Sequence, residues 1–465
     1  MMRYIYVFFI FISSLAVSAQ NKQLLYNFDD LPQTLLSNPG AETNFDMHIG
    51  LPLLSQIHLS AGSSGVSLYD IFKEDGGSIN DRIRESVHKL TRNDFFVVNQ
   101  QLEIFSIGWR DNRRRYYTAG IYQELDAFLY FPKDPALLAY EGNKDYIGEN
   151  FSFSDAAFTA DVLNVFHIGF TNYYSEDLNY GFRGKIYSGV FNAYSVGNRG
   201  TFRTELSPEG PNLYRHYMSG VDVLINTAGW AGLMDSENVT GIGTMSKLGK
   251  RAFLGGNLGL GIDAGFTWYP SDQYRVTGSI LDIGFMRQTK NVESYRYYGN
   301  YETSGIELLF PGTREYWDEW EDDLDRSLKD ETLTNSYTTW RPVKLNASVD
   351  FGFSENAEPC NCYRPMGRRR YYNHLGAQFF AMKRPRGLNY ATTLYYDRTF
   401  NDNFRGKITY TADSFSFSNI GLLVAARLYN FNFYLAADNL LDYTNLAKSR
   451  NASLQIGFQL LFSRE

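Results

Sequence analysis

The chain has 465 residues, of which 35 are Tyr and 35 are Phe, and its mean hydropathy is −0.34. Tyr and Phe favour β-strands. Beyond the N-terminus no apolar run reaches the roughly 18 residues that a membrane-spanning helix needs, so the protein is not a bundle of such helices. The formal net charge of −7 argues against nucleic acid as a main partner.

Residues 1–19 are predicted to form a cleaved signal peptide. Arg3 precedes a short apolar run, and small residues lead up to a break between Ala19 and Gln20. One early cation, a short apolar stretch and a small-residue exit are typical of export signals. A membrane anchor is the alternative, but the run is short for a span.

The polar, irregular stretch 20–43 precedes the first predicted strand and is expected to be a lead-in or a plug, which leaves 44–465 for the main fold. It contains the sequence Asn38-Pro39-Gly40. Further along, residues 79–90 have the pattern of a short amphipathic helix.

Alternating side chains mark the long predicted strands, most clearly between residues 252 and 269. Every second residue there is apolar and the residues between are small or polar, so the two faces of the strand would differ. When tilted, such a stretch could cross a bilayer, with its terminal tryptophan at the membrane boundary. The apolar set is Leu254, Leu258, Leu260, Ile262, Ala264, Phe266 and Trp268, and the opposite set is Asn257, Gly259, Gly261, Asp263, Gly265 and Thr267.

The recurrence of this pattern predicts an all-β fold, a transmembrane antiparallel β-barrel of about 14 strands (about 12–16) with short plug and loop helices. The strands of a soluble β-sandwich also alternate between apolar and polar residues. However, glycines and charged residues occupy the positions predicted to face inward, which suits a polar lumen better than a packed core. With the export signal, this predicts a location in the cell outer membrane, surrounded by lipid. The predicted strands are about 44–51, 56–61, 97–110, 116–131, 164–175, 179–195, 213–227, 252–269, 274–288, 340–353, 373–382, 389–398, 404–413, 418–428, 430–438 and 451–462.

The candidate lumen-facing residues are the polar and charged residues at strand positions predicted to face inward. An acid–base role is conceivable for the histidines, but hydrogen bonding within the lumen is the favoured interpretation. The candidates are His48, His58, His167, Arg183, Lys185, Asp263, Asp350, Arg427 and Asp438.

The acidic segment from Tyr316 to Leu328 is predicted to be a loop helix. Its tryptophans fall on one stripe, which we expect to pack on the mouth of the barrel. A Ca²⁺ site is the alternative, although helical carboxylates do not form the ordered loop that such sites need. With the end of the last strand placed in the periplasm, following the chain back from strand to strand places residues 290–335 outside the cell.

Two segments, Arg113–Tyr117 and Arg368–Tyr372, both read RRRYY. The same tracing places both on the periplasmic side. They are interpreted as a basic, aromatic rim, and pairing with lipid phosphates or with a partner is the alternative.

The sequence resembles uncharacterised Bacteroidota outer-membrane proteins related to FadL-type fatty-acid channels and to barrels that accompany the type IX secretion system. Three strings carry the resemblance: LLSNPGAET, SYTTWRPVKLNASVDFGF and GLLVAARLYNFNFYLAADNLL. In the first, Gly40 stands where the FadL-type segment has Ala. The resemblance implies a barrel of about 14 strands with N-terminal residues in the lumen, but it does not transfer a substrate.

Motifs for catalysis, cofactors and metals are not found. There is no G-x-S-x-G, H-E-x-x-H or Walker sequence, and Gly62-Ser63-Ser64-Gly65 lacks the strand-to-helix context of a nucleophile. Cys360 and Cys362 are too close for an unstrained disulfide and are interpreted as a free pair. We therefore predict no catalytic, cofactor-binding or metal-binding residues and no enzyme activity.

Three functions remain open from the sequence. The first is a FadL-like channel for hydrophobic or amphipathic small molecules. The second is a structural or interaction barrel with a secretion-system or surface protein as its partner. The third is an outer-membrane lipid hydrolase.

Overall fold

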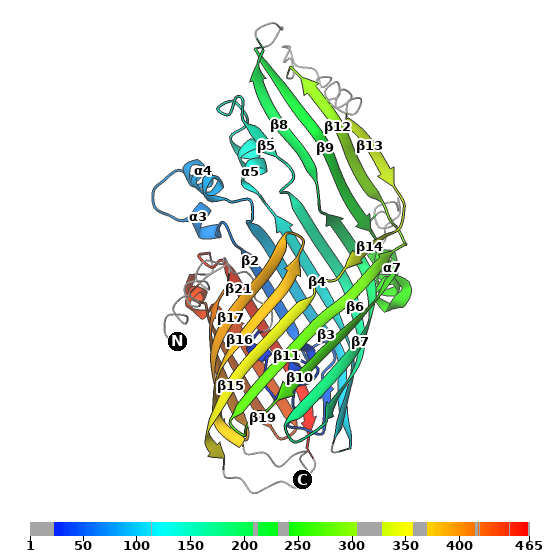
Figure 1. Cartoon of the computed structure of the whole chain (residues 1–465), viewed down its shortest axis with the longest axis vertical. Coiled ribbons are helices and arrows are strands. Elements are labelled where there is room, and N and C mark those ends of the chain that lie inside the picture. The colour runs from blue at the N-terminus through cyan, green and yellow to red at the C-terminus, as the bar shows by residue number, and fades with distance from the viewer. Residues whose placement is uncertain are drawn as a thin grey trace.

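The barrel is closed by its first and last strands. The computed structural model describes residues 23–112, 114–207, 213–230, 241–304, 328–356, 370–413, 417, 419–445 and 447–463. The predicted barrel is confirmed, with 14 antiparallel strands (Figure 1). The first is split into β1 (Met47–Gly50) and β2 (Ile57–Ser63), and both halves pair with β3 on one side and with β21 on the other. The wall continues through β3 (Phe95–Asn112), β4 (Arg115–Tyr130), β6 (Ala157–Tyr173), β7 (Leu178–Ser195), β10 (Asn257–Trp268), β11 (Tyr274–Gln288), β14 (Tyr337–Trp340) with β15 (Lys344–Asn356), β16 (Arg370–Arg384), β17 (Gly387–Asn401), β18 (Phe404–Ala412), β19 (Asn419–Leu428), β20 (Phe431–Asp438) and β21 (Asn451–Phe462).

The two faces of the wall differ as the alternation predicts. On β10, Leu260 and Ile262 are 57% and 59% exposed on the outside, whereas Asp263 is 1% exposed on the inside. The 12 residues of β10, rising about 3.3 Å each and tilted by about 40°, cover roughly 30 Å. An apolar outer face of this height matches the hydrocarbon core of a bilayer.

Connections differ in length between the two ends of the barrel. At the end that holds the C-terminus, strands are joined by turns as short as the one between β19 and β20, whereas loops with helices project from the other end (Figure 1). In bacterial barrels the short turns are periplasmic and the long loops extracellular. The helix expected at 79–90 is confirmed in one of these loops. The helices of the long loops are α3 (Leu68–Phe72), α4 (Ile79–Lys89), α5 (Lys133–Tyr140) and η3 (Leu440–Asn445).

A second sheet extends beyond the barrel on the extracellular side (Figure 1). Its strands pair in the order β5–β8–β9–β12–β13, and β9 also pairs with the upper end of β7. The sequence predicted only the strand at 213–227 and missed the others. These strands are β5 (Asn150–Ser152), β8 (Arg199–Leu206), β9 (Tyr214–Ala228), β12 (Ser294–Thr303) and β13 (Leu328–Leu333).

Two expectations about individual segments are wrong. The strand predicted to start at 252 begins at Asn257, because Leu254 has a positive φ of 62° that breaks the extended backbone. The helix α7 (Gly241–Lys250) and the π-helical turn η2 (Arg251–Gly255) precede it. The strand predicted to start at 44 begins at Met47, and Phe45, which lies before it, packs inside with its ring 5.8 Å from that of Tyr116.

Several predicted features lie outside the described residues. They are the signal peptide at 1–19, the cysteine pair at 360 and 362, most of the acidic segment, and the first residues of both RRRYY segments. The remaining parts of those two segments lie at the periplasmic end, where Arg114 precedes β4 and Arg370 begins β16. No helix in the described part of the chain is long and apolar enough to cross a membrane.

Candidate functional site: the occupied lumen

The chain upstream of the first strand lies inside the barrel. We call residues 23–46 the lumenal segment; it includes the 3-10 turn η1 (Gln23–Leu25) and the short helix α2 (Thr34–Ser37). Its apolar side chains are buried against the inner wall. Leu24, Leu25, Phe28 and Leu31 form one cluster with Leu423, Ala425, Tyr434 and Ala436 of β19 and β20.

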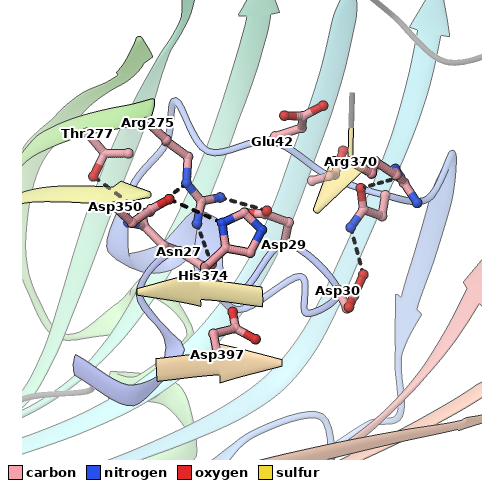
Figure 2. Close-up of polar contacts among 12 residues, drawn as sticks. Asn27, Asp29, Asp30, Glu42, Arg275, Thr277, Asp350, Arg370, His374 and Asp397 are labelled. Carbon is pink, nitrogen blue, oxygen red and sulfur yellow. Dashed lines mark hydrogen bonds and ion pairs between the residues drawn. The ribbon is translucent and has the colours of Figure 1, made fainter. Parts of the chain in front are cut away.

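Arg275 of β11 ties the lumenal segment to the wall, as Figure 2 shows. Its Nε lies 2.8 Å from Oδ2 of Asp350 on β15, and its Nη1 lies 2.8 Å from Oδ2 of Asp29 in the segment. Nη2 also donates to the carbonyl oxygen of Asn27 at 3.3 Å. His374 of β16 contacts the other oxygen of Asp350, with Nδ1 at 3.3 Å from Oδ1. One guanidinium therefore joins a wall carboxylate to a segment carboxylate.

A second anchor lies on β18. The guanidinium of Arg405 pairs with both carboxylate oxygens of Asp397 on the neighbouring strand, and its Nη1 lies 3.1 Å from Oδ2 of Asp30. Two residues along, Lys407 donates from Nζ to the carbonyl oxygen of Tyr26 at 2.6 Å. The wall residues of both anchors are buried, so removing one partner of a pair would leave an uncompensated buried charge, which is costly.

The two segment carboxylates differ in their environment. Burial raises the pKa of Asp29 above its usual value, and the guanidinium of Arg275 offsets this only in part. Burial also acts to raise the pKa of Asp30, but Arg405 and the Asn44 amide outweigh it and lower that pKa. Asp30 is therefore the more firmly ionised of the two.

The Asn38-Pro39-Gly40 sequence lies against β7 and β10 of the wall. The Asn38 side chain donates to a carbonyl oxygen of β10 at 3.1 Å and accepts from the Gly40 amide at 2.9 Å. Opposite, Gly181 of β7 has no room for a side chain, because a Cβ there would overlap with the carbonyl group of Pro39. The predicted plug sequence therefore lies at a backbone-to-backbone contact.

A cavity lies on the extracellular side of α2. Leu36, Leu281 and Phe380 give it apolar surface, and buried charges surround the rest. Its full lining is Leu36, Ser37, Gln101, Tyr122, Glu124, Lys185, Leu281, Asp282, Lys344, Asn346 and Phe380.

The charges beside the cavity compensate one another around Asp282. Lys185 Nζ lies 2.6 Å from one oxygen of Asp282 and 2.8 Å from Asp263, and Lys344 Nζ lies 2.9 Å from the other oxygen of Asp282. Asp282 has a positive φ of 60°, and the register of β10 and β11 shifts beside it. This irregularity turns the Asp282 side chain into the lumen between the two lysines.

Ion pairs cross the lumen on the extracellular side of the cavity. Arg384 of β16 meets Asp126 of β4 with two contacts of 2.6 and 3.1 Å. Arg341, between β14 and β15, meets Glu124 of β4 at 3.1 Å and Asp161 of β6 at 3.3 Å. Since β4 and β6 do not pair with β14, β15 or β16, these contacts span the barrel interior. The cavity thus lies between the lumenal segment and a set of cross-lumen ion pairs.

The structure joins four of the candidate lumen residues to these networks. Lys185, Asp263 and Asp350 have the contacts given above. Arg183 lies 3.0 Å from Asp263 through Nη1 and also donates to carbonyl oxygens of Leu35 and Leu36 in the segment.

Four further candidates have other surroundings. His58, His167 and Asp438 are buried on the inner face, and Asp438 accepts a hydrogen bond of 2.7 Å from the Ser453 hydroxyl. Arg427 is half-buried at the periplasmic rim, where it donates to the carbonyl oxygen of Tyr429 at 2.9 Å.

Sequence reasoning missed most residues that hold the lumenal segment or pair across the lumen. Arg275 and Arg405 lie on the inner face of strands that were predicted, so the parity rule alone could have found them. Asp282 could not be found in this way, because the register shift interrupts the parity. The cross-lumen pairs cannot be found from the sequence because the partners are far apart in the chain: Arg341 and Asp161 are separated by 180 residues, and Arg384 and Asp126 by 258.

His48 contacts a serine, which bears on the hydrolase hypothesis. Its Nε2 lies 3.1 Å from the Ser106 hydroxyl, and its Nδ1 lies 2.6 Å from the Tyr116 hydroxyl. His48 and Ser106 are 3% and 4% exposed, so a substrate would not reach them. In a hydrolytic triad a carboxylate orients the histidine, whereas here a tyrosine occupies that place.

A family model described as "Family of unknown function (DUF5723)" matches residues 39–438. No curated protein matches the sequence.

Several solved barrels resemble the fold at low identity. The Ralstonia pickettii toluene transporter TbuX is 11% identical, with 96% of this chain and 97% of that chain covered and a TM-score of 0.43. A Pseudomonas aeruginosa FadL homologue is 10% identical, with the same coverage and a TM-score of 0.43. The Pseudomonas putida toluene transporter TodX is 9% identical, covers 96% of this chain and 95% of that chain, and has a TM-score of 0.38. Likenesses this distant carry no inference about substrate.

Proposed function

The chain belongs to the Family of unknown function (DUF5723), and we propose that it is an outer-membrane channel in which the lumenal segment acts as a plug. In this proposal the cavity, which has a volume of about 40 Å³ while the segment is in place, widens to bind a small amphipathic molecule when the segment moves. The observation that carries the proposal is the cavity between the segment and the cross-lumen ion pairs. With the segment in place the cavity has room for only a few water molecules, so a larger molecule can bind there only after the segment has moved.

The lining favours an amphipathic ligand over a purely apolar or a purely polar one. Leu36, Leu281 and Phe380 can cover an apolar chain. Gln101 and Asn346 offer amide donors and acceptors for a polar group. The buried charges are already paired with one another, so they set the polarity of the site without demanding a counter-ion from the ligand.

Movement of the plug supplies the passage in this proposal. The segment is held by ion pairs and hydrogen bonds to β10, β11 and β18, and these polar contacts can be exchanged for water. Its apolar contacts with β19 and β20 are also given up when it moves, but the barrel strands pair with one another without it. The plug can therefore leave the wall without the barrel coming apart.

Adjacent phenylalanines on β16 allow a matched test of the binding site. Phe380 lines the cavity and is 2% exposed, whereas Phe379 faces outward and is 40% exposed. The purified protein would be titrated with decanoate, decyl glucoside and decylammonium, and binding measured by native mass spectrometry. We expect at least one probe to bind the wild type, and Phe380→Ala to weaken that binding about tenfold through the lost apolar contact.

The control Phe379→Ala should leave the same affinity unchanged. If none of the three probes binds, or if both variants weaken binding equally, the cavity is not an amphiphile site.

A second candidate function is an interaction barrel, and the extracellular sheet favours it. Among the described strands, β13 pairs on one side only, with β12. A free strand edge can accept a strand from another protein. Photo-crosslinkers at Lys329 and Glu331 should then capture one stoichiometric partner in outer membranes, such as a surface or secretion-system protein, and a ladder of unrelated products would speak against this role.

A further inference from the structure

A helix and a tight turn lie against the outside of the barrel at the upper end of β10 (Figure 1). The segment of α7 and η2 is pinned there by Ser188 of β7. The Ser188 hydroxyl donates to the carbonyl oxygen of Arg251 at 2.7 Å and accepts from the Leu254 amide at 3.0 Å. The pinned segment directly precedes Asn257, the first residue of β10, and so lies at the extracellular end of the apolar outer face of that strand.

Apolar side chains of this segment continue the lipid-facing surface of the wall. Phe253 and Leu254 are 58% and 46% exposed, and the nearby Trp230 is 48% exposed. The Phe253 ring lies 6.3 Å from that of Phe166 on the outer face of β6, and Trp230 lies 5.8 Å from Phe191 of β7. The three exposed groups therefore extend an established apolar surface and are not isolated on the protein.

Cations accompany this apolar surface. Lys247 and Lys250, in the last turns of α7, are exposed. Lys290 joins them, since its Nζ donates to the carbonyl oxygen of Gly255 at 2.9 Å. Apolar groups at acyl-chain depth with cations at headgroup depth are the arrangement of an interfacial helix that binds anionic lipid.

We propose that α7, η2 and Trp230 form a binding site for a phosphorylated lipid of the outer leaflet. Its acyl chains lie against Phe253 and Trp230, and its phosphate lies on Lys247 and Lys250. The site depends on the barrel spanning the membrane and not on what the lumen carries. It is therefore independent of the proposed channel function.

Lipid A with and without its phosphates tests this site. The folded full-length barrel, checked by heat-modifiable gel mobility, would be titrated with each form, and bound lipid counted by native mass spectrometry. We expect the phosphorylated form to bind more tightly, and Lys247→Ser with Lys250→Ser to lose about fivefold for each lysine. Phe253→Ser should weaken both forms of the lipid, because it removes contact with the acyl chains.

A matched control removes two lysines elsewhere on the extracellular side. Lys73 follows α3 and Lys89 ends α4 in the loops, and Lys73→Ser with Lys89→Ser should leave lipid binding at the wild-type level. The site is overturned if the two forms of lipid A bind equally, or if the loop variant loses as much affinity as the α7 variant. It is also overturned if the α7 variant keeps wild-type affinity, or if a co-purifying protein occupies the surface in place of lipid.

Discussion

Single residues decide how closely the lumenal segment approaches the wall. At Gly181 the backbone of β7 meets the carbonyl group of Pro39, and no side chain fits between them. Three residues further along the same strand, Gly184 has open space where a Cβ would lie. The two glycines thus have the same backbone setting and opposite steric surroundings.

This difference makes Gly181→Ala a test of the contact. The added methyl group must push the segment or the strand away, and overpacking of this kind costs about 1–3 kcal/mol. Urea unfolding of the protein folded into lipid vesicles should show that loss for Gly181→Ala, while Gly184→Ala should stay within about 0.5 kcal/mol of the wild type. Equal unfolding midpoints for both variants would mean that the segment does not rest on β7.

The alternation of side chains along a strand was enough to select residues of the inner face, but it could not show which of these residues contact one another. Arg183, Lys185 and Asp263 were selected as inner residues, and β7 and β10 bring them together as neighbouring strands. The partner of Arg384 lies on the far side of the barrel, and closure of the whole sheet sets that distance. The sequence likewise did not predict that Arg275 would contact Asp29, because that contact depends on the path of the lumenal segment.

At the level of the strand, the outer face of β17 should respond to charge according to depth. Leu394 lies at the middle of β17 and is 55% exposed, whereas Leu388 lies near its extracellular end and is 66% exposed. An arginine on the lipid face costs about 2–4 kcal/mol at the bilayer midplane and about 0–1 kcal/mol near the interface.

Leu394→Arg should therefore destabilise the folded barrel much more than Leu388→Arg. The free energy of unfolding in vesicles, measured by tryptophan fluorescence against guanidinium, gives both values. If the two variants lose the same stability, or neither loses any, the outer face of β17 does not meet hydrocarbon.

Membrane-crossing strands could be predicted from the sequence because lipid and lumen impose strict alternation on them. The predicted limits 274–288 and 451–462 coincide with β11 and β21. Outside the membrane this constraint ends, which explains why β8, β12 and β13 were missed. Their two faces meet water and loops, so Arg, Tyr and Glu occur on both.

For the molecule as a whole, the described residues place protein groups across the lumen at two levels. The lumenal segment occupies the periplasmic half, and the pairs Arg384–Asp126 and Arg341–Glu124 cross it nearer to the cell surface. The barrel strands themselves close through β1, β2 and β21 without the segment. Removing the segment should therefore leave a folded barrel with a wider lumen.

Ion conductance across a planar bilayer tests this account most directly. The mature full-length protein should conduct little, and deletion of residues 23–43 should raise the single-channel conductance several-fold, with a further rise when Arg384→Met and Asp126→Leu are added. Heat-modifiable mobility would confirm that each variant is folded. A wild type that already conducts as well as the deletion variant would contradict the claim that the segment closes the channel.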